Sequence, residues 1–281
     1  MRALITGVLG QDGSYLAEHL VEAGHEVFGL TRRANATSPA TLLVGDLLDQ
    51  PSLERALRAS RPDVVYNLAA VTAPGAGWGS PQPPLLADVT GVGVIRLLEA
   101  MTKASPNARL VHASSSAVIE PHRYGLYGAA KLFAHQAVQG YRGRIDASNA
   151  VLYSHSSPRQ DGRFLLPRIC ATIRRFKADR LPLVLGDIHS RRDWGYAPAY
   201  MRAVQEMADE KAGDRVIATG RQHSVCTVTE TALRLAGLDW DDVVRVDPNA
   251  PRVEDEQLAT VDRPVDVDLE AMIGEMLEVR P

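Results

Sequence analysis

Short apolar stretches alternate along the chain with longer segments in which apolar residues recur at helical spacing. Apolar stretches of strand length lie at 3–6, 26–30, 41–44, 64–67, 110–113, 150–153 and 216–218. Segments of helical spacing lie at 12–24, 50–60, 85–104, 127–142, 164–177 and 225–236. Strands that are apolar throughout and alternate with helices are typical of a parallel sheet covered on both faces. The pattern therefore predicts an α/β fold with a doubly wound parallel sheet.

The pattern changes after residue 154. The strand signal thins there, and short basic, proline-containing and acidic stretches follow at 158–163, 191–193 and 249–256. We therefore expect a main domain over 1–153, with a returning strand near 216–219, and a smaller C-terminal lobe formed mainly by 154–281.

Composition narrows the possible partners. The 281 residues contain 31 Lys and Arg against 34 Asp and Glu, and the net charge of −3 provides no basic field for nucleic acid. No run of about 18 apolar residues occurs and the N-terminus does not resemble a signal peptide, so we expect a cytoplasmic protein with no membrane partner. Cys170 and Cys226 are too few and too far apart for a disulfide framework or a thiolate metal site. We expect a small-molecule partner and no metal.

Three glycines follow the first predicted strand, at Gly7, Gly10 and Gly13, and the first predicted helix begins within this turn. A turn without side chains lets backbone N–H groups approach a pyrophosphate at the positive end of a helix. Because strand, turn and helix occur in the order that this mechanism needs, the segment predicts a dinucleotide site. The main domain would then be a Rossmann-type dinucleotide-binding domain, and the C-terminal lobe would bind the substrate.

The end of the second predicted strand indicates which dinucleotide binds. An NAD site usually has an acidic residue there, which bonds the ribose hydroxyls. This chain has Arg32 and Arg33 instead, and guanidinium groups suit the 2′-phosphate of NADP. The alternative is a pair of solvated surface arginines, so we predict NADP and leave NAD open. Asp46, just after the third strand, is placed to accept a hydrogen bond from an adenine amino group.

A second group of polar residues follows the fifth predicted strand. Ser114, Ser115 and Ser116 come directly after that strand, and the next predicted helix carries Tyr127 and Lys131. At positions i and i+4 the phenol and the ammonium share a helix face. A neighbouring positive charge favours the phenolate, so we expect the lysine to lower the pKa of the tyrosine and make it a base for a sugar hydroxyl.

These motifs resemble the extended short-chain dehydrogenases/reductases that act on nucleotide sugars, and within them the GDP-mannose 4,6-dehydratase group. The resemblance is carried by 5–7, 10–18, 45–47, 67–70, Tyr127 with Lys131, His155 with 157–159, 185–186, 192–196, 218–220, 223–225, and 246–248 with Arg252. Of these, 11–18 and 192–196 are specific to that group. It implies NADP, a GDP-sugar substrate, and a 4-keto intermediate that forms when Tyr127 takes the O4 proton as the C4 hydride moves to the nicotinamide.

The resemblance also implies roles for individual residues. Ser115 would hold the O4 region of the sugar, beside the catalytic Tyr127 and Lys131. Cofactor contacts fall on Gly7, Gly10, Gln11, Asp12, Gly13, Arg32, Arg33, Asp46, Leu47, Leu68, Ala69, Ala70, Tyr127, Lys131 and His155. Substrate contacts fall on Ser157, Arg168, Arg192, Arg252 and Glu254, with Arg192 as the first choice for the diphosphate.

Three departures from the dehydratase pattern change the expected chemistry. The dehydratases place a Glu two residues after the active-site Ser or Thr to remove the C5 proton, and this chain has Ala117 there. The loop over 116–126 is short, and Glu120 within it is a candidate replacement for the missing acid. The segment between 33 and 45, through which the dehydratases build a tetramer, is also shortened, so we expect a homodimer.

A methyl group cannot act as a base, so we predict an epimerase that oxidises a GDP-sugar at C4 and returns the hydride. One alternative is a GDP-mannose 4,6-dehydratase with a displaced base. Another is a nucleotide-binding regulator without catalysis, against which Tyr127 and Lys131 count. The sequence leaves the identity of the sugar open.

Overall fold

Eight parallel strands form the central sheet. The computed structural model describes residues 1–33, 35–72 and 82–278. The strand order is β14-β11-β6-β5-β4-β1-β2-β3, and every neighbouring pair is parallel. The order reverses between β1 and β4, which is where an open α/β sheet binds its ligand. The strands are β1 (Arg2–Thr6), β2 (Glu26–Thr31), β3 (Thr41–Val44), β4 (Val64–Asn67), β5 (Arg109–Ala113), β6 (Ala147–Leu152), β11 (Asp214–Ala218) and β14 (Arg263–Pro264).

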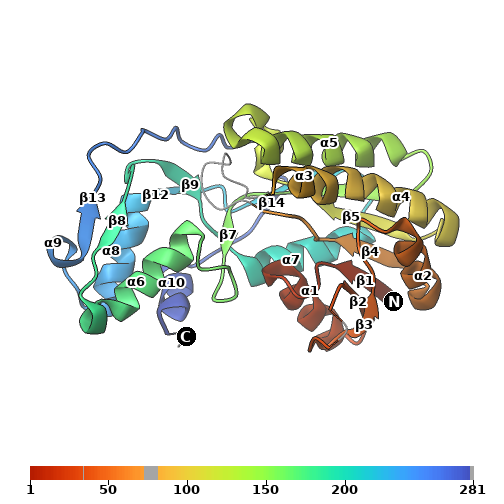
Figure 1. Ribbon diagram of the computed structural model, residues 1–281, viewed down its shortest axis with the longest axis horizontal. Helices are drawn as coiled ribbons and strands as arrows, with labels where there is room; N and C mark the ends of the chain where they lie inside the picture. The colour runs from red at the N-terminus through yellow and green to blue at the C-terminus, as the bar shows by residue number, and fades with distance from the viewer. Residues whose placement is uncertain (34, 73–81, 279–281) are drawn as a thin grey trace.

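Helices cover both faces of this sheet, because alternate residues of each strand point to opposite faces. Ala3 and Ile5 of β1 share a core with helices α1 and α7, whereas Leu4 shares a core with α2, α4 and α5. Figure 1 shows α1 and α7 on one side of the strands and α4 and α5 on the other. The predicted doubly wound α/β fold is confirmed. These helices are α1 (Gln11–Glu22), α2 (Gln50–Ser60), α4 (Gly93–Ala104), α5 (Gly125–Tyr141) and α7 (Ala197–Glu206).

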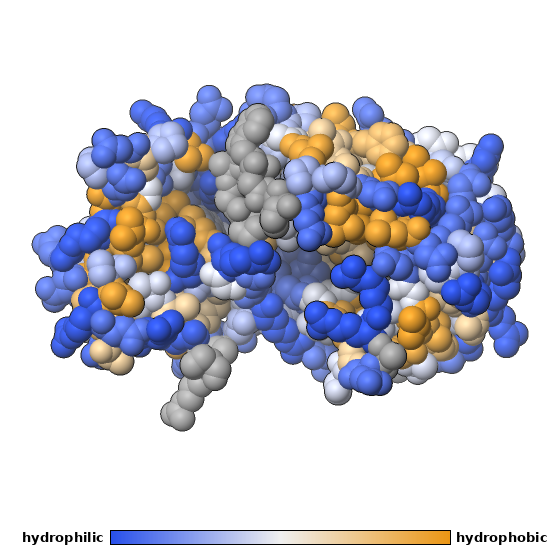
Figure 2. Space-filling view, viewed as in Figure 1, coloured by the Kyte–Doolittle hydropathy of each residue, from blue (hydrophilic) through white to orange (hydrophobic). Residues whose placement is uncertain are grey.

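The smaller lobe has a core of its own, in which helices α6, α8 and α10 pack around strands β8 and β13. Figure 2 shows that the surface is hollowed between this lobe and the main sheet, and that hydrophilic side chains border the hollow. Two short pairs of strands, β7 with β10 and β9 with β12, also lie beyond β6 in the chain. The elements are β7 (His155–Ser156), α6 (Leu165–Asp179), β8 (Leu183–Leu185), β9 (Arg191–Asp193), β10 (Gly195–Tyr196), β12 (Gln222–Ser224), α8 (Val225–Ala236), α9 (Trp240–Val243), β13 (Val244–Val246) and α10 (Leu269–Glu278).

The segment predicted as one helix over 85–104 is helical but changes type along its length. A short helix α3 (Pro83–Leu86) leads into a π-helical segment η1 (Ala87–Val92), which continues as α4. The hydroxyl of Thr90 in η1 accepts a hydrogen bond from Val71 N (3.0 Å) and donates one to Val71 O (3.2 Å). These bonds fasten η1 to the chain that leaves β4.

The sequence pattern does not predict α7, α10 or β14. Helix α7 has Pro198 in its first turn and buries Tyr200, Met201 and Val204 against the main sheet. Strand β14 has two residues, one of them a proline, and pairs with β11. Helix α7 and strand β14 lie beyond residue 153 in the chain, yet they belong to the layers of the main sheet. The predicted domain boundary at residue 153 stays a prediction. Among the described residues, no helix is long and apolar enough to cross a bilayer.

Candidate active site

The turn after β1 can be made only by glycine at two positions. Gly7 has a φ of +70°, and a Cβ there would lie 2.8 Å from Ala69 N. A Cβ on Gly13 would lie 2.2 Å from Gly7 O, so α1 packs against the turn only because that side chain is absent. The N-cap of α1 is Gly10, which has no side chain to satisfy the first N–H groups of the helix. The turn therefore fits a pyrophosphate.

Side chains hold the strand ends beside this turn. Thr6 Oγ1 donates to Asn67 Oδ1 (2.6 Å) and accepts from Ala69 N (3.1 Å), which ties the end of β1 to the chain after β4. This contact brings the turn and the end of β4 together at the switch point of the sheet. The predicted cofactor residues that follow β3 and β4 are Asp46, Leu47, Leu68, Ala69 and Ala70.

Asp12 and His155 form an ion pair between the first turn of α1 and strand β7. The imidazole Nδ1 donates to Tyr153 O (2.7 Å), and Nε2 lies 3.0 Å from Asp12 Oδ1. Burial acts to raise the pKa of Asp12, but the charge and hydrogen bond of His155 hold it below its usual value. Burial acts to lower the pKa of His155, and Asp12 raises it above its usual value. Each pKa shift therefore favours the charged form of its side chain.

A second contact links the same turn to the chain after β7. Ser157 is fully buried, and its hydroxyl donates to Gln11 Oε1 (2.8 Å). The amide of Gln11 donates in turn to Asp12 Oδ1 (3.0 Å). The structure thus places Ser157, predicted from the resemblance as a substrate residue, against the cofactor turn.

Ser115, Tyr127 and Lys131 come together beyond the carboxyl end of β5. Helix α5 presents Tyr127 and Lys131 on one face, and Lys131 Nζ lies 5.9 Å from the centre of the tyrosine ring. The same ammonium donates to Ala113 O (2.8 Å), at the end of β5. Burial lowers the pKa of Lys131 to about 8. The group combines a phenol, a hydroxyl and a cation, as proton transfer at a sugar hydroxyl requires.

The expected effect of Lys131 on Tyr127 is wrong for the free protein. Burial raises the pKa of Tyr127 to about 12, and its hydrogen bond with Ser115 lowers that value only in part. The sequence indicates that a positive charge is near, but it does not show how far the phenol is removed from water. The phenol of Tyr127 therefore keeps its proton near neutral pH in the free protein.

Ala117 and Glu120 are the two positions that matter for loss of water from the sugar. Ala117 lies in the short helical turn η2 (Ser116–Val118) and is 1% exposed. Glu120 precedes a second short turn, η3 (Pro121–Tyr124), and its carboxylate accepts a hydrogen bond from Arg123 Nη1 (2.6 Å). Glu120 is therefore engaged in an ion pair with Arg123.

Arg192 is half-buried on β9, and its Nε has no hydrogen-bond partner among the described residues. Its neighbour Asp193 is fully buried and accepts hydrogen bonds from Tyr200 Oη (3.1 Å), Thr219 N (3.1 Å) and Gly220 N (2.8 Å). Asp193 thereby fixes the strand from which the arginine extends. A buried guanidinium nitrogen without a partner suits a phosphate oxygen.

Sequence reasoning missed Glu256. It lies in an irregular segment between β13 and β14, is 5% exposed, and accepts a hydrogen bond from Ser116 Oγ (2.8 Å). In the sequence it belongs to an acidic stretch with no periodicity, which indicates a solvated surface. A hydrogen bond between residues 140 positions apart leaves no local signal in the sequence.

The remaining predicted residues lie at the surface. Arg33 lines a pocket beside the glycine turn, together with Leu9 and residues 35–37. The Glu254 side chain is 82% exposed, with Oε2 at 3.8 Å from Arg123 Nε. The exposed members of the predicted set are Arg32, Arg33, Arg168, Arg252 and Glu254.

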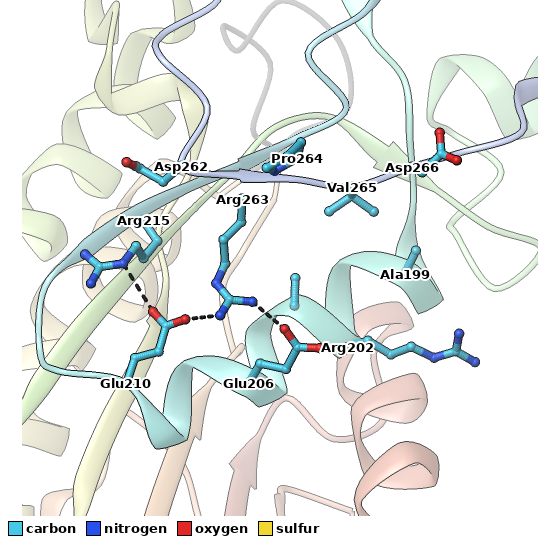
Figure 3. A pocket seen from close by; sticks show the side chains of 11 residues that line it. Ala199, Arg202, Glu206, Glu210, Arg215, Asp262, Arg263, Pro264, Val265 and Asp266 are labelled. Carbon is cyan, nitrogen blue, oxygen red and sulfur yellow. Dashed lines mark hydrogen bonds and ion pairs between the residues drawn. The ribbon is translucent and has the colours of Figure 1, made fainter.

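A separate cavity of about 640 Å³ lies beside α7 and β14 (Figure 3). Arg263 pairs there with Glu206 and Glu210, and Arg215 pairs with Glu210. Its lining includes none of the predicted site residues, so we place the active site elsewhere. Among the described residues, no group of three His, Cys, Asp or Glu side chains could hold a metal ion.

The sequence pattern of the NAD dependent epimerase/dehydratase family matches residues 3–220. The chain belongs to this family. Its cofactor is therefore a nicotinamide dinucleotide, and the glycine turn described above fits that group. The match runs from β1 to just past the end of β11 and so includes Ser115, Tyr127 and Lys131.

Curated relatives within the epimerase/dehydratase family support the predicted resemblance. The chain is 35% identical to GDP-mannose 4,6 dehydratase 1 of Arabidopsis thaliana, over 87% of this chain and 77% of the relative. It is 34% identical to a GDP-mannose 4,6-dehydratase of Vibrio cholerae, over 84% of this chain and 72% of the relative. The protein is thus an enzyme of the extended short-chain dehydrogenase type that acts on nucleotide sugars.

Solved structures show the same fold. An UDP-glucose 4-epimerase of Thermus thermophilus in complex with NAD superposes with a TM-score of 0.82, at 24% identity over 99% of this chain and 98% of that one. A putative epimerase of Burkholderia cenocepacia gives a TM-score of 0.85, at 24% identity over 99% and 97% of the two chains. At this identity the likeness concerns the fold alone.

Proposed function

We propose that the protein is an NADP-dependent enzyme that modifies a GDP-sugar without net oxidation, through a 4-keto intermediate, and that the outcome is epimerisation. The names of the curated relatives support a GDP-sugar, since they are GDP-mannose 4,6-dehydratases. Arg192 Nε has no hydrogen-bond partner among the described residues, and this supports a diphosphate in the lobe. A bound nicotinamide would supply the acceptor and donor of the C4 hydride.

The phenol and hydroxyl of the site would handle the O4 proton. Tyr127 acts here as a phenolate, after its own proton has left to solvent: it accepts the O4 proton as the C4–H bond breaks and gives it back when the ketone is reduced, so the side chain ends each turnover as the phenolate it began as. Ser115, hydrogen-bonded to the phenol, holds O4 within reach. The Lys131 ammonium stabilises the phenolate of Tyr127 before it takes the O4 proton and again after it returns that proton.

The observation that favours epimerisation is Ala117. Loss of water needs a group that removes the C5 proton beside the C4 ketone, and a buried methyl group provides none. Glu120, the other candidate for this base, is held in an ion pair with Arg123. Epimerisation at C4 needs no base for the C5 proton, because the ketone has only to present its other face to the reduced cofactor.

The second candidate is a GDP-mannose 4,6-dehydratase, favoured by 35% identity to a curated dehydratase. The Glu120→Gln variant separates the two, because Gln retains the shape of the side chain and its hydrogen bond but removes its capacity as a base. For an epimerase we expect the variant to have a rate within about twofold of the natural protein, since the amide oxygen can still accept the hydrogen bond from Arg123. Loss of 4-keto-6-deoxy product from GDP-mannose in this variant would instead make Glu120 the displaced base.

NADP preference can be tested by reversing charge at Arg32 and Arg33. A charge-assisted hydrogen bond contributes about 1.5–3 kcal/mol, so the double Arg→Glu variant should bind NADP at least about tenfold more weakly and leave NAD affinity nearly unchanged. Titration calorimetry with both dinucleotides measures this. Arg55→Glu with Arg58→Glu, on exposed α2 positions, makes the same change in net charge and should alter neither affinity. Tighter binding of NAD than NADP by the natural protein would show that the assignment is wrong.

The homodimer remains a prediction. Exposed apolar side chains at Val92, Leu126 and Phe133 lie on η1 and α5, and they are consistent with a contact between copies.

A further inference from the structure

The chain between β13 and β14 runs from the lobe to the catalytic loop and back to the main sheet, as the blue trace in Figure 1 shows. It is fastened at several points. Val253 N donates to Asp187 Oδ2 (2.8 Å), and Arg123 donates to Glu254 O (2.6 Å) and Asp255 O (2.7 Å). We call residues 253–257 the crossing segment. It contacts both the loop that follows Ser115 and the strand that carries Arg192.

Glu256 is the buried side chain of the crossing segment, and it joins these two parts of the site. Its Oε1 accepts from Ser116 Oγ (2.8 Å), and its Oε2 accepts from Asp193 N (3.2 Å). Its own N–H donates to Arg191 O (3.0 Å), so the crossing segment continues alongside β9. One carboxylate therefore bonds the residue after Ser115 and the residue after Arg192.

We propose that Glu256 is a positioning residue for the reaction: its carboxylate sets the separation between the proton-transfer group at Ser115 and Tyr127 and the diphosphate-binding Arg192. The proposal rests on the proposed function, because that function requires the two ends of one nucleotide sugar to be held at the same time. Misplacement of a reacting group by about 1 Å can cost about 10² in rate, so a link of this kind has a large effect.

The chemistry of the contact suits a structural carboxylate. Burial raises the pKa of Glu256, but the hydrogen bonds from Ser116 and Asp193 and the charge of Arg192 favour its ionised form. Both oxygens are occupied by donors, so the link is specified at each end. A carboxylate with two fixed donors holds its neighbours in one arrangement, whereas a hydrophobic side chain at the same place could slide.

Glutamine at position 256 separates positioning from proton transfer. In Glu256→Gln the amide oxygen can accept from Asp193 N and the amide nitrogen can donate to Ser116 Oγ, so both links survive while the acid is lost. In Glu256→Ala both links are lost. Ser116→Ala removes one link without removing the side chain of Glu256. Glu22→Ala, at an exposed position on α1, is the control for loss of a glutamate.

The experiment measures GDP affinity by calorimetry for the five proteins, and kcat and KM with GDP-mannose in the presence of NADP. We expect Glu256→Ala to lower kcat by about 10² and to weaken GDP binding, with NADP affinity unchanged. Glu256→Gln and Glu22→Ala should stay within about threefold of the natural protein, with the same pH profile. Ser116→Ala should lower kcat with an unchanged melting temperature, which gives a result even if Glu256→Ala does not fold.

Two results would overturn the proposal. If Glu256→Ala and Ser116→Ala both have the kcat and the GDP affinity of the natural protein, the link has no role in the reaction. Equal loss of activity in Glu256→Gln and Glu256→Ala would make Glu256 an acid or base rather than a positioning residue. Absence of turnover of any GDP-sugar by the natural protein would contradict the proposed function instead, and the effect on GDP affinity would still decide the role of Glu256.

Discussion

Replacement of Tyr127 by Phe should lower kcat by about 10² to 10⁴, the usual contribution of general acid–base catalysis. The variant loses the phenol that takes and returns the O4 proton, while the ring remains to pack under Lys131. Its NADP affinity and melting temperature should therefore match those of the natural protein. Steady-state kinetics with a GDP-sugar, together with a dinucleotide titration, measure both parts of this expectation.

Tyr124 offers a matched control for that variant. It is a neighbouring phenol at the end of η3, and burial raises its pKa as it does that of Tyr127. It is not on the helix face that carries Lys131, so Tyr124→Phe should retain most of the rate. Near-normal turnover by Tyr127→Phe would remove Tyr127 from the mechanism.

Replacement of His155 by Leu should destabilise the protein by about 3 kcal/mol, because it leaves the Asp12 carboxylate partly buried without its cation. The Asp12 side chain is 26% exposed, which places the effect at the lower end for a buried pair. Replacing Asp12 by Asn in the same chain removes the unpaired charge, so the double variant should be more stable than His155→Leu alone. Thermal or denaturant unfolding of the natural protein, the two single variants and the double variant measures these differences in unfolding free energy.

The pH dependence of the pair follows from the two shifted pKa values. The pKa of Asp12 is lowered, so its contribution is present above the unfolded value and is lost as pH falls through the folded one. The pKa of His155 is raised, so its contribution is present below the unfolded value and is lost as pH rises through the folded one. The difference in unfolding free energy between the natural protein and His155→Leu should therefore be largest between pH 4 and pH 6.5, the approximate unfolded values. A difference in unfolding free energy that grows steadily above pH 8 would show that the two side chains do not form this ion pair.

The main sheet could be predicted because its strands are buried on both faces and therefore appear as continuous apolar stretches. All seven predicted strands are present, and the predicted helix over 225–236 has the bounds of α8. Helix α7 was missed because Pro198 and the preceding Gly195 suggest a loop, although proline is tolerated in the first turn of a helix. Strand β14, with two residues, is too short to produce a pattern.

The candidate site could be predicted where its geometry is local. Tyr127 and Lys131 are four residues apart on one helix, and the glycine turn is continuous in sequence. The contacts of Glu256 and His155 could not be predicted, because each joins segments more than 100 positions apart. The pKa of Tyr127 was predicted in the wrong direction because desolvation depends on the packing around the phenol, which the sequence pattern does not specify.

The most direct test distinguishes epimerisation from dehydration by the product. The protein is incubated in deuterated water with NADP and GDP-mannose or a related GDP-sugar, and the product is analysed by NMR. An epimerase that returns the same hydride to C4 gives a C4 epimer with no solvent deuterium at C5 or C6. That is the result we expect, because Ala117 provides no base for the C5 proton. A 4-keto-6-deoxy product carrying deuterium at C5 or C6 would contradict epimerisation and show that the protein is a dehydratase with a displaced base.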